Sequence, residues 1–164
     1  MSADYAGDLA ATVRDVAKRL RTVTDGEAAR RPAPGQWCAK EIIGHLIDSA
    51  SNNHQRFVRA RWQEDLVFVG YDGDAWVEAQ AYGAAPWREL VDLWQEYNLH
   101  LARVMRATPE AVRQRSHTRH NLDQLAWKPI PSGEPATLDY FMRDYVDHLH
   151  HHVRQIEALV PTGR

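Results

Sequence analysis

The sequence has a single cysteine, Cys38, among its 164 residues. One cysteine excludes an internal disulfide and the paired thiolates of a CxxC metal site. Cys38 follows Trp37 at the start of an expected helix, with no catalytic base at a suggestive spacing. We therefore interpret it as a small packing residue.

An excess of either charge is also missing. The chain carries 20 basic and 22 acidic residues, for a formal net charge of -2, and its arginines are scattered among acids. No basic stripe is available to follow a phosphate backbone, so nucleic-acid binding is not expected.

Long apolar runs are absent as well. No stretch approaches the roughly eighteen uninterrupted apolar residues that a membrane span needs. The opening residues, MSADYAGDLA, lack the basic patch and apolar run of a signal peptide. We expect a cytoplasmic protein that does not act on a membrane.

Apolar residues still make up 44% of the chain, enough for a core, and the length suits a single domain over residues 1–164. Apolar positions recur at helical spacing in four long segments, with no sustained two-residue alternation. These segments are residues 3–24, 37–62, 86–107 and 137–160. Pro86 is expected in the first turn of the third helix, and Thr137 is the expected N-cap of the fourth.

The connections between these helices are rich in Pro and Gly. Shorter helices are expected at residues 74–79 and 109–114, and a loop at 128–133. The pattern predicts an all-α fold, a four-helix bundle with one or two long connections. Periodicity alone leaves the packing order of the helices open.

The last helix contains four histidines within residues 147–153. Positions four apart lie one above the other on a helix, so His148 and His152 share its inner face with apolar residues. His150 points the opposite way and should be solvated, and His151 lies at the flank. A lone HxxxH pair is more often two core-edge histidines held by hydrogen bonds than a metal site, unless a third ligand lies elsewhere.

The second helix offers that third ligand. His45 is followed at intervals of four, three and four residues by Ser49, Asn52 and Arg56, which forms a polar strip beside an apolar one. Such a strip either faces water or lines a cavity. If it lines a cavity, His45, His148 and His152 form a three-imidazole site for a divalent metal with an open coordination position.

The same residues resemble a known family. The run His45-Leu-Ile-Asp-Ser49 with Asn52 and Arg56-Phe57, preceded by Trp37, is similar to the second-helix motif of the DinB-like superfamily. Other matching pieces are Tyr71-Asp72 with Ala75-Trp76 and the closing pair His148-x-x-x-His152. The branch that looks closest contains bacillithiol S-transferases and proteins assigned as metal-dependent hydrolases. His54 departs from the pattern, because relatives can carry an aromatic residue there.

The resemblance implies an antiparallel four-helix bundle, a metal ion held by His45, His148 and His152, and a homodimer. Zinc and nickel both accept three imidazoles. The favoured hypothesis is a transferase that joins a low-molecular-weight thiol, such as bacillithiol, to an electrophilic substrate, because a metal cation stabilises a thiolate.

Several side chains around this site have two interpretations. Ser49, Asn52 and Arg56 would bind substrate, with Arg56 holding a carboxylate or phosphate, but an intramolecular ion pair of Arg56 is at least as plausible. Asp144 is either an outer-shell partner of a ligand imidazole or a surface charge. Trp76 and Trp127 are expected to border the cavity.

Three alternatives to the transferase remain at this stage. Water in place of the thiol would give a metal-dependent hydrolase, although no HExxH glutamate supplies a base. A thiol-dependent isomerase would use the same site. A stress-associated module that binds metal without catalysis is the third.

Overall fold

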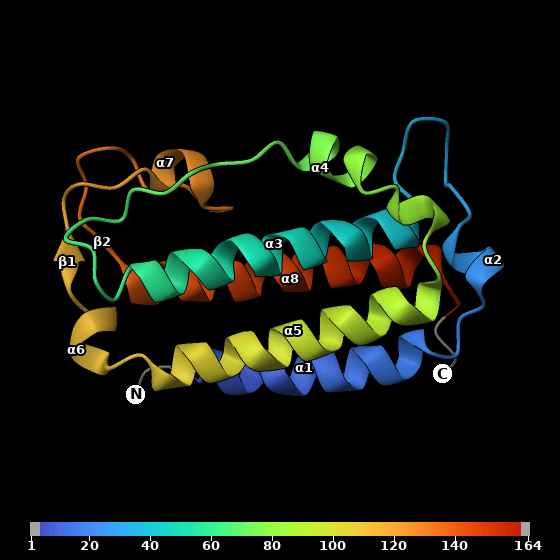
Figure 1. Cartoon of the computed structure of the whole chain (residues 1–164), viewed down its shortest axis with the longest axis horizontal. Coiled ribbons are helices and arrows are strands. Elements are labelled where there is room, and N and C mark those ends of the chain that lie inside the picture. The colour runs from blue at the N-terminus through green and yellow to red at the C-terminus, as the bar shows by residue number, and fades with distance from the viewer. Residues whose placement is uncertain (1–3, 162–164) are drawn as a thin grey trace.

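The computed structural model describes residues 4–161, and four long helices form its body (Figure 1). They are α1 (Tyr5–Leu20), α3 (Ala39–Arg59), α5 (Trp87–Ala107) and α8 (Leu138–Leu159). The predicted all-α four-helix bundle is confirmed. None of the helices in the described part of the chain is long and apolar enough to cross a bilayer.

Short elements occupy the connections. They are α2 (Asp25–Ala28), α4 (Gly73–Ala79), the 3-10 helix η1 (Tyr82–Ala84), α6 (Glu110–Arg113), α7 (Leu122–Leu125), β1 (Ser116–His117) and β2 (Ala136–Thr137). The strands pair antiparallel, with Ser116 opposite Thr137. Periodicity did not reveal α2, α7 or the strands, because each is too short to show a period.

The ends of the long helices differ from the sequence prediction by a few residues. α1 stops at Leu20 because Thr24 starts α2 with a capping box to Glu27. The predicted start at Ala3 lies outside the described residues. α3 begins after Cys38 and ends at Arg59, so Trp37 precedes the helix. Pro86 is the N-cap of α5, in an extended conformation, rather than a residue of its first turn.

The helices do not simply alternate in direction. Contacts of His45 with His148 and of Phe57 with Phe141 show that α3 and α8 are antiparallel. α3 and α5, however, run the same way, because Lys40 bonds to the carbonyl of Ala85 near one end and His54 contacts Tyr97 farther along. The long connection over residues 60–86 makes this possible, since it returns along the whole bundle before α5 begins (Figure 1).

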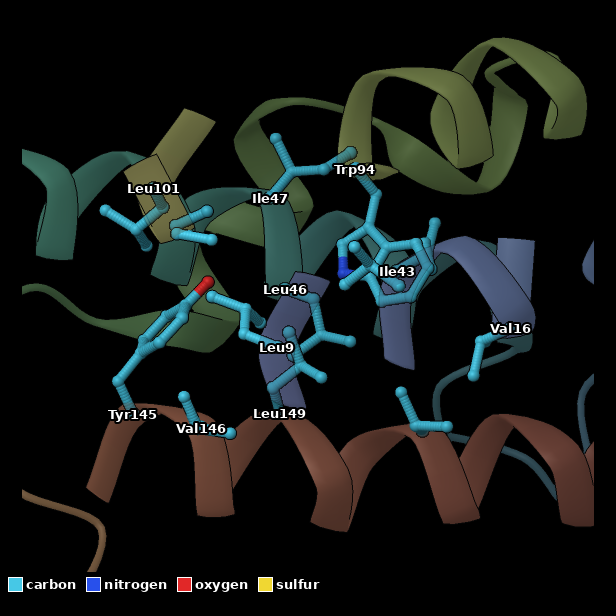
Figure 2. Close-up of a cluster of buried hydrophobic side chains, with 14 of the residues drawn as sticks. Leu9, Val16, Ile43, Leu46, Ile47, Trp94, Leu101, Tyr145, Val146 and Leu149 are labelled. Carbon is cyan, nitrogen blue, oxygen red and sulfur yellow. The ribbon is translucent and has the colours of Figure 1, made fainter. Parts of the chain in front are cut away.

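Side chains from all four helices fill the core. Figure 2 shows Leu9 and Val16 of α1, Ile43 of α3, Trp94 of α5 and Leu149 of α8 in one cluster between the helices. The side chains of Leu9, Ile43, Trp94 and Leu149 are fully buried. Burial of these apolar faces is the main force that holds the helices in place.

The connection after α3 is attached to that helix by a buried carboxylate. Asp48 is 2% exposed and accepts hydrogen bonds from the Tyr82 hydroxyl at 2.7 Å and from Gln80 Nε2 at 2.8 Å. Gly44 lets the Tyr82 ring lie against the helix, because a Cβ there would come within 2.1 Å of it. This attachment keeps α4, and Gly73 at its start, above His45.

Candidate metal centre

Three histidines from two antiparallel helices, α3 and α8, converge between these helices. The Nε2 atoms of His45 and His148 are 3.5 Å apart, and those of His148 and His152 are 3.0 Å apart. One nitrogen from each ring lies within 4.8 Å of the others. The structure thus brings together the three histidines that the sequence analysis predicted as metal ligands.

All three imidazoles are held neutral. Burial, followed by the charge of His152, lowers the pKa of His45 to about 4. Burial and the neighbouring histidines lower the pKa of His148 to about 3. Burial also lowers the pKa of His152, and its hydrogen bond to Gln155 opposes that shift. Neutral nitrogens that face one another are the donor set that a divalent metal ion requires, so the residues fit such an ion.

The outer partner of His152 is a residue that the sequence analysis passed over. Nδ1 of His152 lies 2.7 Å from Oε1 of Gln155, and Nε2 of Gln155 lies 3.1 Å from Nε2 of His151. An acceptor at Nδ1 fixes the tautomer that presents Nε2 to a metal. Gln155 could have been predicted from the sequence, because a residue three positions after His152 lies next to it on a helix. Nδ1 of His45 is buried with no partner among the described residues.

Asp144 does not serve as the predicted outer-shell partner, nor is it a surface charge. It is buried, and its two oxygens accept hydrogen bonds from the backbone N–H groups of Trp127 and Lys128, both at 2.8 Å. Burial raises the pKa of this carboxyl, and the two N–H groups oppose that shift. Asp144 therefore positions the loop that carries Trp127 to the site.

A cavity of about 430 Å³ opens beside the histidines. His45 and His148 line one part of it, and Ser49, Asn53 and Arg56 continue the lining along α3. Residues 124–127 of the connection and Phe141, Asp144 and Tyr145 of α8 also line it, so apolar and polar side chains are mixed there.

Comparison with known proteins assigns the chain to a family. The profile of the DinB superfamily matches residues 8–156. The chain belongs to the DinB superfamily. A relative in Bacillus subtilis (strain 168), YfiT, named as a candidate metal-dependent hydrolase, is 24% identical over 140 residues, which cover 85% of this chain and 73% of YfiT.

The solved structure of YfiT, described as a four-helix bundle of unusual topology, superposes with a TM-score of 0.73 at 23% identity. The match covers 97% of this chain and 87% of that structure. At this identity the structural similarity shows that this DinB superfamily member and YfiT share a fold.

Asn52 is not part of the cavity of this DinB superfamily protein. Its Nδ2 donates to the carbonyl of Asp48 at 2.9 Å, and its neighbour Asn53 takes the expected place. The cavity follows the groove between α3 and α8, and a groove between packed helices follows residues spaced by four. Steps of four residues lead from His45 through Ser49 to Asn53. The sequence analysis predicted Asn52 instead, because it assumed a strip parallel to the helix axis.

Arg56 lies in the cavity and makes no ion pair with any residue between 4 and 161, contrary to one of its two interpretations. Its Nη2 donates to the carbonyl of Val69 at 2.9 Å, and its guanidinium carbon lies 5.9 Å from the centre of the Tyr71 ring. Burial lowers the pKa of this guanidinium.

Aromatic rings surround the three histidines. The Trp37 ring lies 5.2 Å from that of His45, and the Trp127 ring lies 6.3 Å from that of His148. Trp127 thus borders the cavity as expected. Trp76 does not line it, and instead packs against Tyr71 at 5.0 Å.

The remaining candidate side chains lie away from the three ligands or serve packing. His150 is half-buried and pairs with Asp8 at 2.8 Å, rather than being solvated. His54 contacts Tyr97 on α5 and does not line the cavity. Cys38 is buried, and burial raises the pKa of its thiol, as suits a packing residue.

Proposed function

We propose that this protein is a metal-dependent transferase that joins a low-molecular-weight thiol, such as bacillithiol, to an electrophilic substrate. The observation that supports this proposal is the convergence of His45, His148 and His152 beside an open cavity, with no fourth side-chain ligand among residues 4–161. Three imidazoles suit zinc or nickel and leave a coordination position for a small molecule. Such a cation lowers the pKa of a bound thiol and stabilises its thiolate.

The walls of the cavity suit two different reactants. The α3 wall carries the polar groups of Ser49, Asn53 and Arg56, which can bind and orient the polar part of a thiol. Leu125 and Phe141, which also line the cavity, can exclude water and pack against an apolar electrophile. The chain thereby holds both reactants near the metal ligands and reduces the entropic cost of their encounter.

Hydrolysis is the second candidate, favoured by the name of the relative YfiT. A hydrolase would need a base to activate or relay a proton from water. Asp144 is the acidic residue that lines the cavity, and both of its oxygens are occupied by backbone N–H groups. Thiol chemistry needs no such base, because a thiol ionises several pH units below water. A thiol-dependent isomerase would use the same groups as the transferase.

The test is an assay of the zinc- and nickel-loaded protein with bacillithiol, glutathione and cysteine, using 1-chloro-2,4-dinitrobenzene as the electrophile. We expect conjugation that a chelator abolishes and that is lost in His45→Ala. His150→Ala is the matched control, because this histidine pairs with Asp8 outside the site. Chelator-insensitive conjugation would contradict the proposal, and metal-dependent hydrolysis of an activated ester without thiol would favour the hydrolase.

One further expectation belongs to the proposal, and one alternative to it can be tested in the same assays. The homodimer implied by the family resemblance is tested by light scattering of the purified protein. A metal-binding module without catalysis would bind zinc with the same dependence on His45 but would show no thiol-dependent turnover.

A further inference from the structure

A buried positive charge without a counter-ion lies in the cavity of the candidate metal centre. Arg56 is 6% exposed, and no carboxylate among residues 4–161 lies within ion-pair distance of it. Buried charges in proteins are normally paired, because an unpaired ion loses its hydration without compensation. Arg113, by contrast, pairs with buried Asp139 in the same protein.

The hydrogen bonds of Arg56 leave much of its guanidinium unused. Nη2 donates to the carbonyl of Val69 at 2.9 Å, and Nη1 lies 3.4 Å from Oδ1 of Asn53. A guanidinium has five N–H donors, so most of them have no acceptor in the described part of the chain. Tyr71 covers one face of the group at 5.9 Å. An oxyanion held by two parallel N–H donors would satisfy both the charge and the donors.

Arg56 lines the same cavity as two of the three candidate metal ligands, His45 and His148. His45 and Arg56 are three turns apart on α3, which places their Cα atoms roughly 16 Å apart at 1.5 Å per residue. The connection between Val69, which contacts Arg56, and Gly73, which lies against His45, spans at most about 14 Å. A molecule that reaches from Arg56 to the histidines is therefore an extended one, with its two functional groups at opposite ends.

We propose that Arg56 binds a carboxylate of the thiol while the sulfur of the same molecule lies at the three histidines. This inference rests on the proposed transferase function and narrows its substrate class. It selects thiols that carry an anionic group remote from sulfur, of peptide or sugar-acid size, over small aminothiols. The cavity of about 430 Å³ has the size of pockets that bind small molecules of this kind.

The experiment measures thiolate binding to the cobalt(II)-loaded protein through the sulfur-to-cobalt charge-transfer absorption. The two probes are glutathione and its dimethyl ester, which share the thiol and differ in their carboxylates. We expect the parent protein to bind glutathione about 10- to 100-fold more tightly than the ester, the range for a charge-assisted bidentate contact. In Arg56→Gln the two affinities should become equal, and Arg56→Lys should retain part of the preference.

Arg59→Gln is the matched control, because it removes an exposed arginine of the same helix that does not line this cavity. It should leave the preference for glutathione unchanged. Equal affinities of the parent protein for the two probes would overturn the subsite, as would a preference that survives Arg56→Gln. Absence of charge transfer with either thiol on cobalt-loaded protein would overturn the transferase itself, and the subsite with it. A preference that instead follows a carboxylate on the electrophile, in turnover with 4-chloro-3-nitrobenzoate, would assign Arg56 to the other reactant and overturn the proposal.

Discussion

Nδ1 of His152 lies 2.7 Å from Oε1 of Gln155, one turn farther along α8. This contact sets the tautomer of one candidate ligand from the side opposite to the metal. We expect Gln155→Ala to weaken zinc binding by about 10- to 100-fold, the usual cost of losing an outer-shell acceptor. Gln155→Glu keeps an acceptor and should bind zinc at least as tightly. Competition with a chromophoric chelator measures both variants, and an unchanged affinity in Gln155→Ala would show that the contact has no such role.

Asp144 bonds to the backbone of the loop and not to a candidate ligand. Its removal should therefore lower stability and leave metal affinity nearly unchanged. Asp144→Ala removes two hydrogen bonds to the backbone of Trp127 and Lys128, so it should lower the free energy of unfolding by about 2 to 4 kcal/mol. Zinc affinity of the folded variant should stay within a few-fold of the parent, because no ligand histidine bonds to this carboxylate. A loss of zinc affinity as large as that of Gln155→Ala would show that Asp144 does act as an outer-shell partner of a ligand histidine.

The half-buried histidines of the site predict a loss of stability in mild acid for the metal-free protein. The pKa of His45 is about 4 and that of His148 about 3, against an ordinary value near 6.5 in the unfolded chain. Between pH 6.5 and 4 the unfolded state therefore binds more protons than the folded state, and the free energy of unfolding falls as the pH falls. Each histidine contributes up to about 1.4 kcal/mol per pH unit in this window.

Urea unfolding at several pH values, in the presence of a chelator, measures this dependence. His45→Gln should show a shallower slope, because it removes one of the three site histidines whose pKa is lowered. His150→Gln, at a histidine that pairs with Asp8 outside the site, is the comparison. A slope that is the same in His45→Gln as in the parent would contradict the assignment to His45.

Two glycines give a matched pair that tests how the connection after α3 is held. A Cβ at Gly44 would come within 2.1 Å of the Tyr82 ring, so Gly44→Ala should destabilise by about 1 to 3 kcal/mol through overpacking. Gly26, in α2, has open space around it, and Gly26→Ala should be neutral or stabilise by up to about 1 kcal/mol. Equilibrium unfolding in urea gives the free energy of unfolding of both variants. Equal effects would mean that the close contact of Gly44 with Tyr82 does not affect stability.

Local periodicity was sufficient to predict the four long helices, because an apolar face repeats every 3.6 residues whatever the helix packs against. The same geometry separated His148 and His152 from His150 on α8. The motif around His45 indicated the DinB superfamily, and the family comparison confirmed it. These features depend on residues close together in the sequence, or on a motif that can be recognised without coordinates.

Tertiary packing decided the rest. The parallel course of α3 and α5 depends on where the connection at residues 60–86 travels, which no local pattern encodes. The presence of Asn53 rather than Asn52 in the cavity depends on how α3 and α8 pack. The lack of an ion-pair partner for Arg56 depends on every element packed around it. These outcomes arise from contacts between segments distant in sequence, whose geometry is set only when the helices bury their apolar faces together.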